Sequence, residues 1–242
     1  LEQIEQAYLL RTLGADSTVS YHGFVADIGR LPIAVGPDPQ TQLSELWLAV
    51  DLPTFTLTEF NDPDTSAAET IPVAAGWRGP YLNLPPGPAV LRDGFGNGLI
   101  FDIDTNLGNA IVGMKSSGGL NQYAGEISPP GGLWEAGRYQ GIVPVSIKDS
   151  NGADPVLNGE TLYVRLYGPV DGEADRISNV EVDSGFTGEY STNLQGVTCG
   201  PRVLWVAVVT GTSPDETVVR QSSYKQIMVS PGMNATITVK IN

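Results

Sequence analysis

The sequence has little of what common hydrolases use for catalysis. Its 242 residues include one histidine, His22, and one cysteine, Cys199. A lone cysteine excludes an intrachain disulfide, and every histidine-based triad or metal cluster would depend on His22. No G-x-S-x-G segment marks a serine nucleophile. We therefore predict no enzyme activity and no catalytic residue. We interpret His22 as structural or solvent-exposed and Cys199 as a semi-buried, unreactive thiol.

Basic residues are scarce as well. The chain has 13 Lys and Arg against 27 Asp and Glu, which gives a net charge of −14. Such a surface repels phosphate backbones and anionic lipid, so we expect no nucleic-acid partner and no docking on an anionic membrane surface. The simplest interpretation is a surface suited to solubility outside the cytoplasm.

Long apolar runs are absent too. No stretch approaches the ~20 apolar residues that cross a bilayer, and no signal peptide is visible. Because the chain begins with Leu1, we expect that a segment upstream has been removed. Hydrophobic residues nevertheless make up 41% of the chain, enough for a folded core, and Gly 29 and Pro 18 are spread along it. This spacing favours short strands joined by turns.

Two segments predict helices. In LEQIEQAYLLRTLG (1–14), apolar residues recur at three- and four-residue spacings and form one stripe, and Gly14 is a plausible stop. No cap precedes this helix, so we expect it to be the end of a longer, truncated one that packs on a small sheet. In DPQTQLSELWLAV (38–50), an Asp-Pro start and one apolar face predict a second helix. We expect a loop from Leu52 to Ala75.

The rest of the chain favours strands. LIFDI (99–103), NAIVGM (109–114) and YAGEI (123–127) have the spacing of an antiparallel meander. Residues 128–139 are rich in Pro and Gly and predict a boundary between two domains, 1–138 and 139–242. Beyond it, several strand-like runs with turn spacing predict an independent immunoglobulin-like or transthyretin-like β-sandwich. Its segment 202–209 is apolar on both faces, which predicts a central strand.

Three segments in order carry a family resemblance: GFVADIGRLP (23–32), GWRGPYL (76–82) and DGFGNGLIF (93–101). Together they resemble bacterial type IV pilins and the pseudopilins of type II secretion systems, over roughly residues 1–127. Phe95 and Gly98 stand where that family usually has Trp and Pro. The motifs suit turns and aromatic contacts and need no substrate to explain them.

The resemblance implies an α+β fold, in which a truncated N-terminal helix packs on a small antiparallel sheet, followed here by the added sandwich. It also implies a non-enzymatic subunit of a type IV pilus or of a type II secretion-like pseudopilus. Such a subunit sits in a bacterial cell envelope, anchored in the inner membrane and joined to other subunits through the missing helix. The alternative is an adhesin or binding module, whose sandwich recognises a surface glycan or a partner protein through exposed loops such as GPVDGEADR (168–176).

The sequence gives little support for a metal or cofactor site. Major pseudopilins bind calcium through aspartates in a loop after the 93–101 segment, but the comparable stretch 114–127 lacks them. Two acidic segments, 61–69 near Asp62 and 102–106 near Asp102, place carboxylates close together. They are either solvated loops or partial ligand sets for a hard cation, and the complete twelve-residue calcium loop is absent. We therefore assign no metal or cofactor residues.

Overall fold

The chain is built mainly from β-strands in the computed structural model, which describes residues 2–35, 42–49, 51–62, 70–84, 91–93, 96–116, 136–183, 189–211 and 216–242. Its three α-helices there are short: α1 (Glu2–Tyr8), α2 (Phe24–Ile28) and α3 (Ala136–Tyr139). The predicted α+β class, in which a truncated N-terminal helix packs on a small antiparallel sheet, is therefore wrong, because strands predominate in both halves. No helix in the described part of the chain is long and apolar enough to cross a membrane.

The described residues of the N-terminal half contain three two-stranded antiparallel sheets. Their strands are β1 (Leu10–Leu13) with β2 (Val19–His22), β3 (Thr56–Asn61) with β4 (Thr70–Ala75), and β5 (Leu99–Asp104) with β6 (Ala110–Ser116). The described part of this half also contains two short 3₁₀ helices, η1 (Ser44–Leu46) and η2 (Thr105–Leu107). The β5–β6 pair agrees with the predicted meander, while residues 123–127 lie outside the described residues.

The C-terminal half forms two larger sheets in the part that the structure describes. One has the order β10 (Ser191–Thr198), β7 (Gln140–Asp149), β14 (Ile237–Ile241), with β14 parallel to β7. The other has the order β12 (Thr217–Gln221), β11 (Gly200–Thr210), β8 (Thr161–Val170), β9 (Glu173–Glu181), and β13 (Lys225–Val229) also pairs with β11. These two sheets are called the sandwich below.

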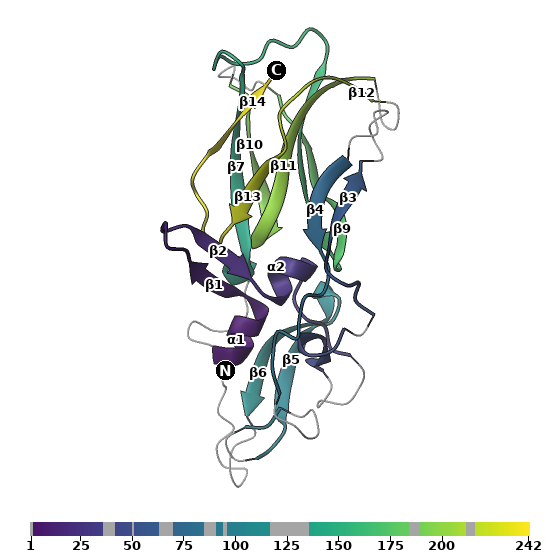
Figure 1. Ribbon diagram of the computed structural model, residues 1–242, viewed down its shortest axis with the longest axis vertical. Helices are drawn as coiled ribbons and strands as arrows, with labels where there is room; N and C mark the ends of the chain where they lie inside the picture. The colour runs from purple at the N-terminus through teal and green to yellow at the C-terminus, as the bar shows by residue number, and fades with distance from the viewer. Residues whose placement is uncertain are drawn as a thin grey trace.

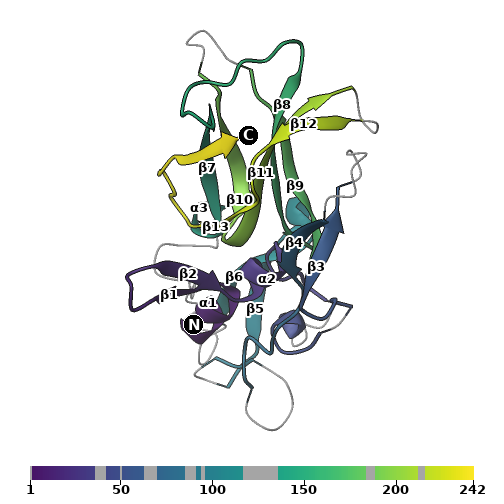
Figure 2. The same ribbon diagram turned by 45° about the horizontal axis from the view of Figure 1, so that its top comes forward.

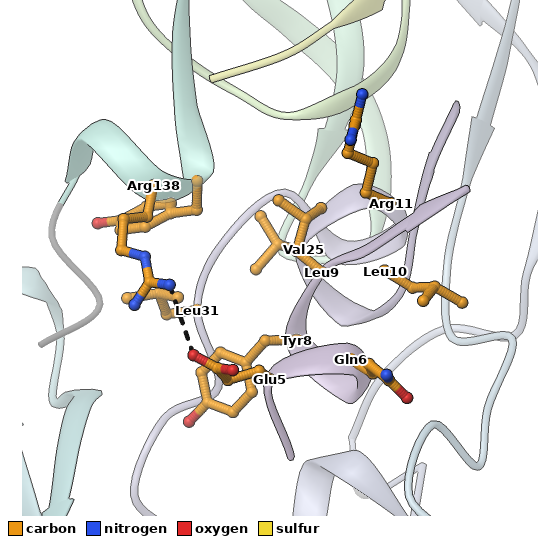
Figure 3. A pocket seen from close by; sticks show the side chains of 10 residues that line it. Glu5, Gln6, Tyr8, Leu9, Leu10, Arg11, Val25, Leu31 and Arg138 are labelled. Atoms are coloured by element: carbon orange, nitrogen blue, oxygen red, sulfur yellow. Dashed lines mark hydrogen bonds and ion pairs between the residues drawn. The ribbon is translucent and has the colours of Figure 1, made fainter. Parts of the chain in front are cut away.

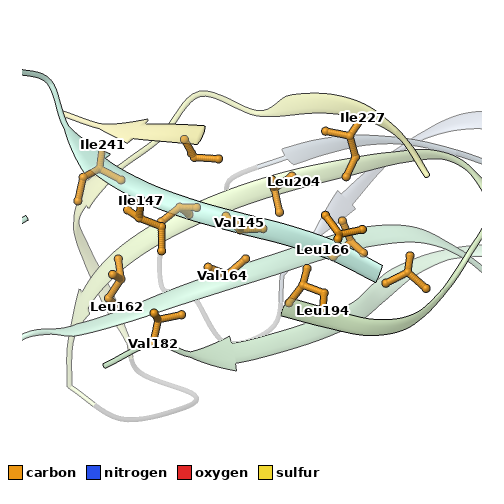
Figure 4. Close-up of a cluster of buried hydrophobic side chains, with 14 of the residues drawn as sticks. Val145, Ile147, Leu162, Val164, Leu166, Val182, Leu194, Leu204, Ile227 and Ile241 are labelled. Carbon is orange, nitrogen blue, oxygen red and sulfur yellow. The ribbon is translucent and has the colours of Figure 1, made fainter. Parts of the chain in front are cut away.

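The core of the sandwich lies between its two sheets (Figure 4). Aliphatic side chains from both meet there because alternate residues of each strand point to one face. Val145 and Ile147 of β7 meet Val164 of β8 and Leu204 of β11, and all four are almost fully buried.

Strand β11 is central and buries both of its faces, as its sequence predicts. One face, with Leu204, points into the core between the sheets. The other carries Val203 and Trp205 and packs against Ile71 and Val73 of β4. The β3–β4 hairpin of the N-terminal half therefore covers the outer face of the larger sheet, and it lies beside β9 in both ribbon views (Figures 1 and 2).

The helix predicted over residues 1–14 is wrong beyond Tyr8. Leu10–Leu13 adopt extended backbone and pair with Val19–His22, so tertiary pairing overrides the helical spacing. Ile4 and Tyr8 are buried, as the apolar stripe predicts, but Leu13 is 67% exposed. Leu1 lies outside the described residues.

The other two local predictions for the N-terminal half also fail. Of the helix predicted over 38–50, the described part contains only η1, although Leu43 and Leu46 are buried. The predicted loop 52–75 instead contains the β3–β4 hairpin. Residues 63–69 at its tip lie outside the described residues.

The ends of the chain are far apart, with α1 near the junction of the two halves and the last strand at the other end of the sandwich (Figure 1).

Candidate functional site

Two of the three motifs that carry the family resemblance, 23–32 and 76–82, meet around helix α2. Phe24 is fully buried, and its ring meets the ring of Tyr81 edge to face at 5.8 Å. The Tyr81 hydroxyl donates to Asp27 Oδ2 at 3.1 Å, and the backbone N–H of Gly76 donates to the Asp27 carbonyl. The indole N–H of Trp77 donates to the Glu45 carbonyl at 2.9 Å. Motifs about fifty residues apart in sequence thus form one cluster, called the Asp27 cluster below.

Electrostatics in the Asp27 cluster are set by burial. Asp27 is 4% exposed, and its carboxylate lies 3.2 Å from the guanidinium of Arg78. Burial raises the pKa of Asp27, while Arg78 and the Tyr81 hydroxyl oppose the rise. Burial also raises the pKa of Tyr81. The carboxyl is already bonded to two donors, so this arrangement is suited to holding segments together.

Arg30 extends the cluster to the sandwich. Its guanidinium donates to Glu45 at 2.8 and 3.0 Å and to Asp171 in the β8–β9 turn at 2.6 Å. Gly29 beside it has φ 87°, and a Cβ there would lie 1.9 Å from the carbonyl oxygen of Pro169. This motif position therefore requires glycine both for its backbone conformation and for its close contact with β8.

The third motif joins the same half of the molecule through its own turn. The side chain of Asp93 accepts from the N–H of Asn97 at 2.8 Å and from the hydroxyl of Ser116 in β6 at 2.5 Å. Residues 94–95, between the two, lie outside the described residues. The first motif reaches the same strand, because the N–H of Ile111 donates to the carbonyl of Pro32 at 2.9 Å.

A second cluster of charges lies beneath the β3–β4 hairpin. Arg165 of β8 has no exposed surface and bonds to Asp62 at the end of β3 and to Glu216. Asp62 also accepts from the hydroxyl of Tyr167 at 2.5 Å and from Arg176 at 2.8 Å. Buried charges require such partners, so this cluster, called the Arg165 cluster below, fastens the hairpin to the sheet.

His22 and Cys199, the two residues considered for catalysis, lie in different surroundings. His22 is exposed at the end of β2. Cys199 is fully buried, and burial raises the pKa of its thiol to about 12. Its carbonyl accepts from Arg202, which also donates to the carbonyl of Ala26, and burial lowers the pKa of Arg202 to about 10.

The acidic segments considered for cations do not come together in the described residues. Asp62 belongs to the Arg165 cluster, whereas Asp102 pairs with Lys115 at 3.0 Å and Asp104 caps η2. No group of three or more His, Cys, Asp or Glu side chains suited to a metal occurs in the part of the chain that the structure describes.

The segment 168–176 contains the β8–β9 turn, in which Asp171 and Glu173 are exposed, and part of it contacts the N-terminal half. The N–H of Gly172 donates to the carbonyl of Ile28 at 2.9 Å, and Asp171 pairs with Arg30. Contacts with α2 therefore cover part of the surface that an adhesin could have used for binding.

Comparison of the chain with protein-family models, curated proteins and solved structures finds no significant match. The functional assignment therefore depends on the motifs and their packing. Sequence reasoning found the motif containing Asp27 but missed Glu45 and Arg165, because only the folded chain brings their partners close.

Proposed function

We propose that the chain is a non-enzymatic subunit of a type IV pilus or of a type II secretion-like pseudopilus, with the sandwich facing outward. The supporting observation is that the three family-like segments pack into connected parts of one half of the molecule, with their side chains used in contacts. The fold class expected from the resemblance is wrong, so the proposal depends on these motifs and not on the architecture.

The proposal includes a place and partners. The subunit would belong to a bacterial envelope, be held in the inner membrane before assembly, and then contact other pilin or pseudopilin subunits. Nucleic acid is not among its expected partners, since the net charge of −14 repels phosphate. The exposed position of His22 and the raised pKa of the Cys199 thiol support a role without catalysis.

Filament isolation tests the proposal. The natural gene, with everything encoded upstream, would carry an epitope tag at Gly152, in the exposed turn after β7. We expect sheared filaments to contain the tagged chain and immunogold to label them. An untagged strain controls for antibody background. Labelling confined to soluble fractions, with filaments intact and unlabelled, would contradict the assignment.

The binding-module alternative is favoured by one observation. The loop joining β7 to β8 lies at the end of the sandwich far from α1 (Figure 1). Val156 in this loop is 71% exposed. Binding of the purified chain to a glycan array, lost on Val156→Asp but kept on Val219→Asp, would support an adhesin. Val219 is the matched control because it is an exposed valine that belongs to strand β12 and not to this loop.

A further inference from the structure

A cavity lies where α1, β1 and α2 meet helix α3 (Figure 3). Its volume is about 320 Å³, which suits a small organic molecule. Leu9, Val25 and Leu31 give it an apolar lining, and Tyr139 also borders it. Burial of apolar atoms against this lining would stabilise a ligand that has a short hydrocarbon body.

The charge balance of the cavity is the reverse of that of the whole chain. Among its described lining residues, Arg11 and Arg138 are basic and only Glu5 is acidic. The full sequence has 13 basic and 27 acidic side chains. The cavity is therefore a locally cationic place on an acidic protein, which favours an anionic ligand group.

The guanidinium of Arg138 is incompletely paired among the described residues. Its Nη2 lies 3.5 Å from Glu5 Oε1, at the limit of a hydrogen bond, and the two side chains face each other in Figure 3. Its Nη1 is buried and has no hydrogen-bond partner there. A guanidinium binds a carboxylate best through two parallel N–H···O bonds, and the single long contact with Glu5 falls short of that arrangement.

We propose that this cavity binds a small organic carboxylate. Its carboxylate replaces Glu5 at Arg138 and supplies an acceptor to Nη1, while its apolar body packs on Leu9, Val25 and Leu31. The same chemistry is offered by a free short-chain acid and by the C-terminal residue of a peptide. The carboxylate site does not depend on the filament role, and it has a separate test.

The test uses the full chain and four probes: hexanoate, hexanamide, an N-acetylated Ala-Leu dipeptide, and the C-terminal amide of that dipeptide. Calorimetry gives affinity, and amide chemical shifts locate binding. We expect a carboxylate probe to bind and to shift the signals of Leu9, Val25 and Leu31, and its amide to bind at least about tenfold more weakly. Binding of hexanoate alone identifies a free acid, and binding of the peptide acid identifies a C-terminus.

Three variants sharpen the result. Arg138→Gln should weaken carboxylate binding about tenfold or more, since it removes a charge-assisted pair. Glu5→Gln should strengthen it about two- to fivefold, because it removes the competing carboxylate. Arg220→Gln is the matched control and should change nothing, since Arg220 pairs with Glu160 on the sandwich with similar exposure.

Equal binding of acids and amides, or shifts confined to residues away from the cavity, would overturn the proposal. So would the absence of binding by every carboxylate probe at millimolar concentration. Thermal unfolding of each variant shows whether it is folded. If Arg138→Gln does not fold, Glu5→Gln decides, and unchanged or weaker carboxylate binding by that variant rejects the site.

Discussion

Asp27 makes the stability of the protein depend on pH in a defined direction. Burial raises its pKa above the ordinary value of 3.8, so the folded state holds this proton more tightly than the unfolded state does. The resulting stabilisation is present at low pH and is lost as the pH rises through the folded-state pKa. Asp27→Asn keeps the shape of the side chain and removes this titration.

We therefore expect the free energy of unfolding of Asp27→Asn, measured relative to the unchanged chain, to rise between about pH 4 and pH 7. Urea unfolding at several pH values measures the difference, and groups that do not interact with Asp27 cancel. A relative stability that stays flat or falls over this range would show that the Asp27 pKa is not raised.

Arg165 is the residue on which the charges beneath the hairpin depend. Arg165→Met should destabilise the protein by about 3–5 kcal/mol, because Glu216 and Asp62 lose a buried cationic partner. Arg220→Gln, which breaks a more exposed Arg–Glu pair, should cost less than about 1 kcal/mol. Urea unfolding of both variants would contradict this account if their losses were equal.

At the scale of elements, the β3–β4 hairpin offers a matched pair of substitutions. Ile71 is fully buried beneath it, whereas Leu57 on the neighbouring strand is 68% exposed. Ile71→Ala should cost about 2–5 kcal/mol, and Leu57→Ala about 0.5 kcal/mol or less. Thermal and urea unfolding measure both. A small decrease in the free energy of unfolding for Ile71→Ala would mean that packing of the hairpin contributes little to the stability of the sheet.

The same hairpin shows why the sequence predicted some elements and missed others. Strand β11 was predictable because its run of apolar residues covers both faces of a strand, which is typical of a central, buried strand. Strand β3 is exposed along most of its length and has no apolar alternation to find. Strand β4 contains Pro72, which argues against a strand in sequence reasoning, although here it sits in a two-stranded pair.

The helical predictions failed for a different reason. Over a few residues, the spacing of Leu9 and Leu13 fits a helix, but pairing with Val19–His22 decides the backbone. The site was predictable only in part. Asp27 stands in a recognisable motif, whereas Arg165 and Asp62 are about a hundred residues apart and meet only through the tertiary fold.

At the scale of the whole molecule, the predicted boundary at residue 138 can be tested by expressing residues 139–242. We expect a β-rich far-UV circular dichroism spectrum, because the core between the two sheets lies within this fragment. We also expect it to bind a hydrophobic dye more strongly than the full chain, since Trp205 and Val203 lose their cover from β4.

A helical or unfolded spectrum would contradict the domain boundary. A folded fragment without added dye binding would contradict the role of the hairpin as a cover. The full chain with Ile71→Ala serves as an intermediate control, because it keeps the hairpin and loses only part of the contact.

The position of the hairpin also affects how the chain folds during synthesis. Ile71 and Val73 leave the ribosome before β8 and β11, which provide the surface on which they pack. Until the larger sheet exists, these side chains have only local neighbours to cover them. The early part of a nascent chain is thus open to chaperones, proteases and other chains. Closure of the hairpin on the sheet must be a late event in maturation, after translation has passed residue 210.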